Sequence, residues 1–124
     1  MNQLLAVGAG GFLGALSRHG VTRLFLRLAG PNFPYGTLAA NLLGCLMIGF
    51  MAGRIEIGRD PGDLPKLFFM TGFLGSFTTF STFSLETYRM LEQSAWWMAL
   101  ANLSVHLVVG IAAVVCGFNA ARLS

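Results

Sequence analysis

Stretches without a single charged residue alternate along this chain with short segments where charges and prolines gather. The uncharged stretches cover residues 1–17, 28–53, 67–85 and 93–121. A helix that crosses a lipid bilayer needs ~20 mainly apolar residues, and each stretch approaches or exceeds that length. The pattern therefore predicts an all-α integral membrane protein with four transmembrane helices.

We place the four helices at about residues 3–27, 36–54, 66–92 and 96–119. Pro31 and Pro34 mark the turn between the first two helices. Residues 55–65 form the longest loop, which is polar. Trp96 and Trp97 suit the membrane–water interface at the start of the fourth helix. This arrangement puts both chain ends on the same side of the membrane.

Composition favours lipid over water as the solvent, because 55% of the residues are hydrophobic and 10% are charged. The four helices leave too few residues for a folded aqueous domain, so residues 1–124 are expected to form a single transmembrane domain. The first apolar stretch lacks the basic start of a signal peptide and is kept as a true helix. The eight basic residues are scattered over helix ends, which argues against nucleic acid as a partner. Cys45 and Cys116 both fall within apolar stretches and are expected to be small, buried, reduced side chains.

Positive charges near the helix ends are almost evenly divided between the two sides of the membrane. The side with the termini and the long loop carries Arg54, Arg59, Lys66 and Arg122, and the other side carries Arg23, Arg27 and Arg89, with Arg18 nearby. Because Lys and Arg normally set the orientation, a balanced chain is expected to insert both ways up. Two opposite copies would pair as an antiparallel, dual-topology homodimer. The alternative is a weak bias that an insertion partner or the loop length resolves.

Small residues recur at helical spacing and predict close contacts between helices. The rows are Gly10 and Gly14 leading to Arg18, then Gly36, Ala40 and Gly44, and finally Gly49 and Gly53. In lipid, such residues let helix backbones approach closely. The run Gly8, Gly10, Gly11 and Gly14 lacks the spacing of a dinucleotide-binding loop, so we assign it to packing.

Arg18 is a charge inside a membrane helix, which makes it a functional candidate. Its side chain is long enough to reach the nearby interface. There it would serve a structural role at helix ends, or it would raise the positive potential at a pore mouth and attract anions.

The third helix contains an unusual mixture of glycines, hydroxyl groups and phenyl rings in residues 72–84. Clustered glycines and hydroxyls permit a break in a membrane helix, provided that the freed backbone groups meet protein, water or an ion. Half-helix ends beside such a break form ion sites. The alternative is an unbroken helix whose Ser and Thr side chains bond to neighbouring helices.

Several uncharged polar side chains are available inside the predicted helices to bind a small anion. They are Asn41, Ser81, Thr82, Ser84, Asn102 and His106. No carboxylate lies deep in the helices to repel an anion. Phe80 and Phe83 share one face, and the weakly positive edges of their rings could coordinate a small hard anion. A single amide in a membrane helix also commonly serves to join helices, and that reading stays open.

Three segments resemble the CrcB/Fluc family of fluoride channels. They are GGFLGALSR at residues 10–18, PYGT at 34–37 leading to Asn41 and Gly44, and GFLGSFTTFSTFS at 72–84. The resemblance covers nearly the whole chain, and the third segment is its most specific part. It implies a dual-topology homodimer with two antiparallel pores in the cell (inner) membrane, with the third helix broken mid-membrane. It also implies passive, fluoride-selective conduction that protects microbes from fluoride toxicity.

The resemblance further assigns roles to individual residues. A structural sodium ion would bind the backbone carbonyls of Gly75 and Thr78 from both subunits. Fluoride would pass Asn41, Phe80 and Phe83, with Ser81 and Thr82 in an adjoining polar track. Arg18 matches the family arginine, Glu86 resembles the acidic residue near the end of the track, and Asn102 and His106 would continue the track on the fourth helix. Gly110 supplies no hydroxyl where some relatives have one.

Two other functions fit part of the pattern. A small dual-topology, proton-coupled drug exporter has similar length, but it needs a membrane-embedded carboxylate, and only Glu86 and Glu92, late in the third helix, are available. A subunit that only binds a partner leaves residues 78–84 unexplained. An enzyme is not expected, because His106 lacks a paired nucleophile or metal-ligand cluster.

Overall fold

The computed structural model describes every residue from Met1 to Ser124, and its regular structure is entirely helical. In chain order the elements are α1 (Asn2–Ala29), α2 (Tyr35–Glu56), α3 (Asp63–Lys66), the π-helix η1 (Leu67–Leu74), α4 (Gly75–Phe77), α5 (Phe80–Glu92), α6 (Trp96–Ser104), the π-helix η2 (Val105–Val109) and α7 (Gly110–Leu123). Elements α3, η1 and α4 follow one another without a gap, as do α6, η2 and α7. The four predicted helices are therefore present, the third of them in two parts.

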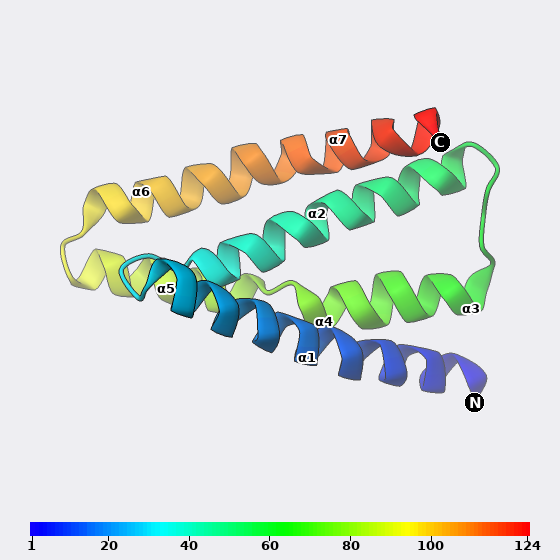
Figure 1. Ribbon diagram of the computed structural model, residues 1–124, viewed down its shortest axis with the longest axis horizontal. Helices are drawn as coiled ribbons and strands as arrows, with labels where there is room; N and C mark the ends of the chain where they lie inside the picture. The colour runs from blue at the N-terminus through cyan, green and yellow to red at the C-terminus, as the bar shows by residue number, and fades with distance from the viewer.

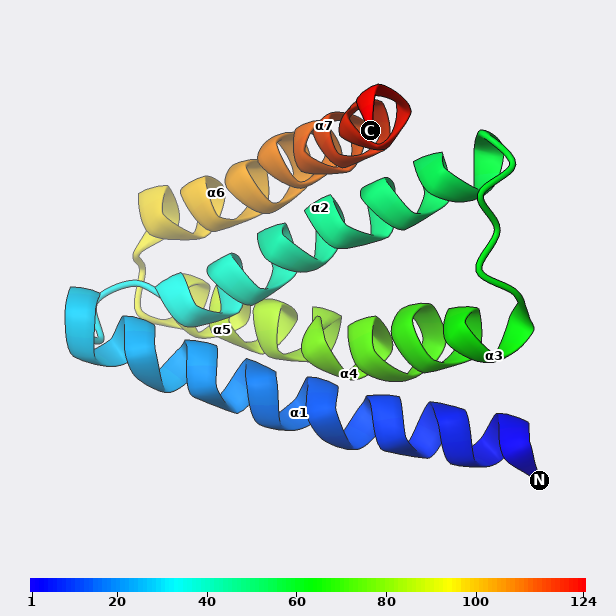
Figure 2. The same ribbon diagram turned by 45° about the vertical axis from the view of Figure 1, so that its right-hand side comes forward.

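The helices lie side by side, with both chain ends at the same end of the molecule, as Figures 1 and 2 show. Helix α2 packs against α7 and α1, and α1 also packs against η1 and α4. The observed helices are slightly longer than expected. The first continues to Ala29 and the fourth to Leu123 instead of ending near 119.

The hydrophobic pattern did not predict the two π-helices, whose turns are wider than those of an α-helix. It predicted uninterrupted α-helices at these positions. η1 leads into the short helix α4, and η2 contains His106. π-helical turns occur mostly as short insertions and often at functional sites. Both insertions lie on the helices that carry the candidate site residues.

Glycines bring the helix backbones into direct contact, as their spacing predicted. A Cβ atom at Gly10 or Gly14 would collide with the carbonyl oxygen of Phe68 or Phe73, respectively. A Cβ at Gly36 would lie 2.6 Å from Thr22 Cα, which fixes the approach of α2 to α1.

The assignment of Gly8 to the same packing face was wrong, because a Cβ there would meet no atom within 4 Å. Gly8 turns away from η1 on the surface of α1.

Helices α2 and α7 are held together in the same manner along most of their length. A Cβ at Gly49 would strike the Val114 carbonyl, and one at Gly117 would strike the Leu46 carbonyl. At the end of this pair, Arg122 donates a 2.6 Å hydrogen bond to Glu56. This pair forms the most continuous contact in the molecule.

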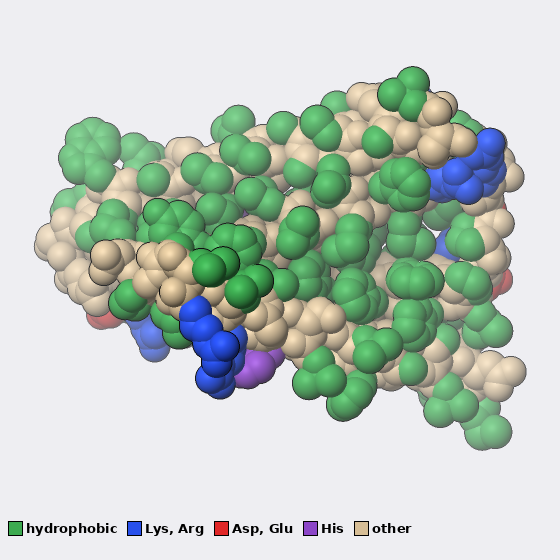
Figure 3. Space-filling model, in the orientation of Figure 1, with side chains coloured by type: hydrophobic (Ala, Val, Ile, Leu, Met, Phe, Trp, Pro, Cys, Tyr) green, Lys and Arg blue, Asp and Glu red, His purple; other side chains and the backbone are tan.

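Most of the surface is apolar, and only 19 of the 124 residues are buried. Large hydrophobic side chains are exposed on every helix except the short α4, and examples are Phe12, Phe50, Phe69 and Leu107. They cover much of the face in Figure 3. Helices α2 and Trp96–Leu123 are each long and apolar enough to cross a membrane. An apolar exterior of this kind is suited to lipid.

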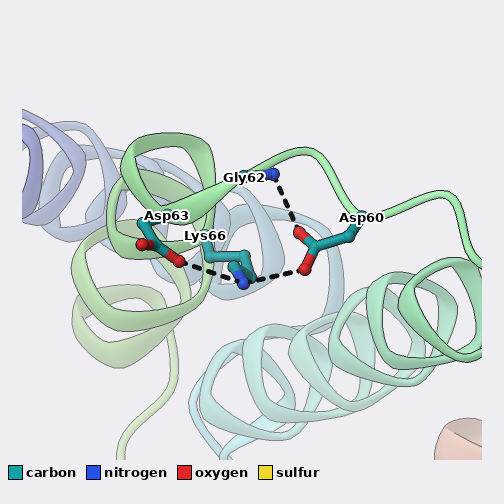
Figure 4. A network of polar contacts seen from close by, with 4 residues as sticks. All are labelled: Asp60, Gly62, Asp63 and Lys66. Carbon is teal, nitrogen blue, oxygen red and sulfur yellow. Dashed lines mark hydrogen bonds and ion pairs between the residues drawn. The ribbon is translucent and has the colours of Figure 1, made fainter.

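The loop before the third helix is tied together by charged groups (Figure 4). Asp60 accepts a 2.8 Å hydrogen bond from Gly62 N and forms a 3.0 Å ion pair with Lys66. Asp63 contacts the same Lys66 ammonium at 3.3 Å. The Gly62 amide and the Lys66 ammonium lower the pKa of the Asp60 carboxyl below its usual range. The polar loop expected from the sequence is thus an ordered turn.

Candidate functional site

The third helix is interrupted at Thr78 and Thr79. Helix α4 ends at Phe77 and α5 begins at Phe80. The two residues between them are extended, with φ −86° and ψ 160° at Thr78 and φ −153° and ψ 116° at Thr79. Extended backbone cannot continue the helical hydrogen-bond ladder, so the backbone groups of these residues need other partners.

Asn41 supplies two of those partners. Its Nδ2 donates to Thr79 O at 3.1 Å, and its Oδ1 accepts from Thr79 N at 2.8 Å. The side chain therefore replaces both hydrogen bonds that an adjacent strand would provide. Asn41 lies on α2 and so joins that helix to the interruption.

The Thr79 hydroxyl group begins helix α5. It accepts a 3.2 Å hydrogen bond from Thr82 N, which makes Thr79 the N-cap. It also donates to the Thr82 hydroxyl at 3.0 Å and lies 3.4 Å from the Ser81 hydroxyl. The hydroxyl groups of Ser81 and Thr82 are thus gathered at the start of α5, where the helix dipole is positive.

Two carbonyl groups near the interruption are released from the helical ladder. The Thr78 carbonyl oxygen accepts no hydrogen bond. Thr79 N, which would donate to Gly75 O in a continuous helix, donates to Asn41 instead. Thr78 N and its hydroxyl both donate to Leu74 O, at 3.0 and 2.9 Å. The carbonyl oxygens of Gly75 and Thr78, which the resemblance assigned to a cation, therefore have lone pairs that the helix does not use.

A cavity of about 710 Å³ opens beside the interruption. Among the predicted site residues, it is lined by Asn41, Gly75, Thr78, Phe80, Phe83 and His106. No Asp, Glu, Lys or Arg lines the cavity. Cys45 and Ser104 also line it and were not predicted to do so. Neither cysteine forms a disulfide, as expected, but the expectation that both are buried was wrong: Cys45 is half-buried and Cys116 is exposed on the apolar surface of α7.

Three aromatic rings form a row along this cavity. The ring centroids of Phe80 and Phe83 are 5.8 Å apart, and those of Phe83 and His106 are 4.3 Å apart. Phe80 is 79% exposed, so its ring packs against little else in the chain. His106 Nδ1 lies 2.9 Å from the Asn102 carbonyl oxygen. Because a carbonyl only accepts, this contact places the proton on Nδ1 and leaves Nε2 as an acceptor in the neutral ring.

Asn102 does not line either of the two main cavities. Its side chain is fully buried, and its Nδ2 donates to Thr87 Oγ1 at 2.9 Å. The Thr87 hydroxyl in turn donates to Phe83 O at 2.8 Å. The structure therefore places Asn102 outside the cavity, where it is buried between α6 and α5.

Glu86 lies in a second cavity of about 310 Å³, together with Thr37 and Arg89. The Thr37 hydroxyl donates to Glu86 Oε1 at 2.7 Å, while Oε2 is buried without a hydrogen-bond partner. This cavity also contains the turn of residues 30–37. The structure does not bring Glu86 into the cavity of the phenyl rings.

Arg18 is partly exposed and forms no hydrogen bond or ion pair within the chain. It lines neither of the two main cavities.

Sequence reasoning missed three threonines: Thr37, Thr79 and Thr87. Each hydroxyl contacts a predicted residue or its backbone. Thr37 and Asn41 are four residues apart on α2, and Thr87 and Phe83 are four apart on α5, so helical spacing could have indicated them. No sequence signal marked the contact between Thr79 and Asn41, since it crosses from one helix to another.

Comparison with known proteins adds independent evidence. The family model described as "CrcB-like protein, Camphor Resistance (CrcB)" matches residues 5–118. "Fluoride-specific ion channel FluC 2" of Symbiobacterium thermophilum is 47% identical over 115 residues, covering 92% of this chain and 93% of that protein. "Fluoride-specific ion channel FluC" of Agrobacterium fabrum is 39% identical over 122 residues and 98% of both chains.

A third relative, "Fluoride-specific ion channel FluC" of Dehalococcoides mccartyi, is 39% identical over 117 residues, which cover 94% of this chain and 90% of that protein. All three matches extend across the helix interruption and both cavities. The family model and the relatives thus span all three motif segments of the sequence. The chain therefore belongs to the CrcB-like protein family.

Proposed function

We propose that this chain forms a fluoride-selective ion channel that lets fluoride leave the cell passively and so relieves its toxicity. The observation that carries the proposal is the convergence of Asn41, Phe80 and Phe83 on one cavity beside the helix interruption. The names of the relatives, each a fluoride-specific channel, support the same ion. Conduction breaks no covalent bond, and a channel of this kind is not an enzyme.

The chemistry of the cavity suits a small anion. Fluoride is strongly hydrated, so a pore must replace its water with donors of comparable total strength and still release it. Amide, hydroxyl and phenyl-edge groups bind an anion more weakly than a fixed positive charge does. We infer that fluoride moves in partly dehydrated steps past Asn41, Phe80 and Phe83, and along Ser81 and Thr82.

Three further predicted residues would act along the pathway. His106, which lines the main cavity, would continue the polar track, and Glu86, which lies in the second cavity, would stand near its end. Arg18 would attract anions at the pore mouth. Asn102, which is buried between α6 and α5, would act on the track through other residues.

We propose an antiparallel dual-topology homodimer with two pores as the working assembly, in the cell inner membrane. The nearly even distribution of Lys and Arg supports it. The exposed Phe80 ring and the open cavity beside it support it as well, because a second copy would cover them. In that assembly the interruption would lie near mid-membrane, where freed backbone groups require protein, water or an ion.

A structural sodium ion fits the interruption. Sodium is a hard cation that prefers oxygen ligands, as calcium and magnesium do. The Thr78 carbonyl accepts no hydrogen bond, and the Thr79 amide is turned from Gly75 O to Asn41. Gly75 and Thr78 from both copies would hold the ion, and its charge would raise the positive potential beside the pores.

Fluoride efflux from liposomes tests the proposal. Purified protein reconstituted in liposomes should release fluoride rapidly, measured with an ion-selective electrode, and should release negligible chloride in a parallel run. A folded dimer that moves no fluoride would overturn the proposal. The proton-coupled drug exporter would then be examined by substrate-dependent proton flux, with Glu86 as its candidate carboxylate.

A further inference from the structure

We propose that Asn102 and Thr87 are positioning residues for Phe83, which hold this phenyl ring in the orientation that conduction requires. The inference rests on the proposed channel function and deepens it. Asn102 lies on α6, Thr87 and Phe83 lie on α5, and the contact between the two helices is polar at this point.

The first connection runs through two hydrogen bonds. Asn102 Nδ2 donates to Thr87 Oγ1 at 2.9 Å, and Thr87 Oγ1 donates to Phe83 O at 2.8 Å. Asn102 is 0% exposed and Thr87 is 6% exposed. Buried hydrogen bonds of this kind are costly to break, because water cannot replace the lost partner. The backbone of Phe83 is thereby coupled to helix α6.

The second connection runs through the rings. The Phe83 and His106 centroids are 4.3 Å apart, and His106 Nδ1 donates to Asn102 O, 2.9 Å away. Asn102 is therefore linked to Phe83 by two routes. Its side chain reaches the Phe83 carbonyl through Thr87, and its backbone carbonyl reaches the Phe83 ring through His106. A closed set of contacts of this kind restricts both the position and the tilt of the ring.

Asn102 acts through Phe83 and not as a ligand of the ion. It lines neither main cavity, and neither does Thr87. One N–H of the Asn102 Nδ2 group is bonded to Thr87, and the side chain is 0% exposed, so its second N–H faces neither of these cavities. An ion that moves through the cavities therefore does not meet the Asn102 side chain.

The closing experiment compares three variants with wild-type protein in the fluoride-efflux assay. Thr87→Val keeps the shape of the side chain and removes both hydrogen bonds, and we expect efflux to fall about tenfold. Thr87→Ser keeps the hydroxyl and should retain most of the efflux. Asn119→Ala removes an exposed asparagine from α7 and should leave efflux unchanged. Equal efflux from Thr87→Val and wild type would overturn the inference.

A double-mutant cycle separates positioning from a general loss of stability. If Thr87 acts through Phe83, adding Thr87→Val to Phe83→Ile should reduce the residual efflux no further. A variant that merely damages the fold would lower efflux by the same factor in both backgrounds. That additive result would count against a positioning role.

A readout that needs no conduction completes the test. With 4-fluorophenylalanine at position 83, the ¹⁹F NMR spectrum of wild-type dimer should show one narrow signal. Thr87→Val should broaden or split it, while Thr87→Ser and Asn119→Ala should not. An unchanged signal in Thr87→Val would refute the positioning role even if wild type conducts no fluoride. Absent efflux in wild type with a split signal in Thr87→Val would refute only the proposed function.

Discussion

Asn41 on α2 and Thr79 between α4 and α5 are joined by a pair of hydrogen bonds, one in each direction, at 3.1 and 2.8 Å. The pair connects a side chain to a backbone that has left the helical ladder. Its geometry makes Asn41 a structural partner of the interruption as well as a residue of the cavity lining. A substitution at Asn41 is therefore expected to change both the stability of the fold and the cavity lining.

Replacing Asn41 by Leu should destabilise the protein strongly. Two backbone groups of Thr79 would lose their partners, and each buried group left without one costs about 1–3 kcal/mol. Asn41→Asp keeps the acceptor for Thr79 N and should preserve more stability. Thermal unfolding in detergent, followed by circular dichroism, measures both. If Asn41→Leu unfolded at the wild-type temperature, the pair would have no structural importance.

Phe80→Ile should reduce fluoride efflux by a large factor while leaving the dimer intact. The fold of the chain should survive because Phe80 is 79% exposed and contributes little to the internal packing. The dimer should survive because isoleucine keeps an apolar side chain where the second copy would cover Phe80. An aliphatic side chain lacks the positive ring edge that would face the anion. Efflux from liposomes and size-exclusion chromatography report the two properties. Phe50→Ile on α2 is the matched control, and undiminished efflux in a well-folded Phe80→Ile protein would contradict the role.

Gly49→Ala should prevent stable packing of α2 against α7. The added Cβ would overlap the Val114 carbonyl, which belongs to the backbone and cannot turn aside. Overpacking typically costs about 1–3 kcal/mol and sometimes more. Gly20→Ala is the control, because a Cβ there meets nothing within 4 Å. The yield of folded protein and its unfolding temperature should fall in the first variant alone.

The carboxyl of Asp60 should titrate below the usual value for aspartate, about 3.9, because Gly62 N and Lys66 favour its charged form. Its folded-state pKa is lowered, so its stabilising effect is present above the unfolded pKa and is lost as pH falls through the folded one. NMR titration of the side chain measures this directly. An ordinary midpoint would mean that the loop contacts of Figure 4 do not persist in solution.

Removing sodium should weaken the dimer. If carbonyls of Gly75 and Thr78 hold the ion, replacing sodium with N-methylglucamine leaves them without a ligand, which favours dissociation or local rearrangement. The dimer fraction at a series of dilutions, measured by single-molecule photobleaching in liposomes, gives the dissociation constant in each medium. Identical constants would argue against a structural ion.

The sequence was sufficient for the architecture because the signals for it are local. Charge-free stretches marked the four helices, and glycine spacing marked their contacts at Gly10, Gly14 and Gly49. The prediction that Gly8 contacts another helix was wrong for a simple reason. A glycine permits another helix to approach closely, but the rotation of α1 about its own axis decides whether that glycine faces a neighbouring helix.

The site was harder to predict because its contacts cross between helices. Composition suggested polar residues in the pathway but could not separate His106, which lines the cavity, from Asn102, which lies outside it. These two are four residues apart, yet a π-helix begins between them. The contacts of Asn41 with Thr79 and of Glu86 with Thr37 depend on the tertiary fold, so the sequence did not identify these pairs.

The reciprocal glycine contacts of α2 and α7 restrict how this protein can move. Gly49 sits against the Val114 carbonyl and Gly117 against the Leu46 carbonyl. A slide of one helix past the other by a single residue would drive ordinary Cβ atoms into both carbonyls. We therefore expect the two helices to move as one rigid body, so that a pair of spectroscopic labels placed across them reports a fixed separation. This constant distance between α2 and α7 would serve as a reference. Distances from the pair to a third label on α5 would then show whether α5 moves during conduction.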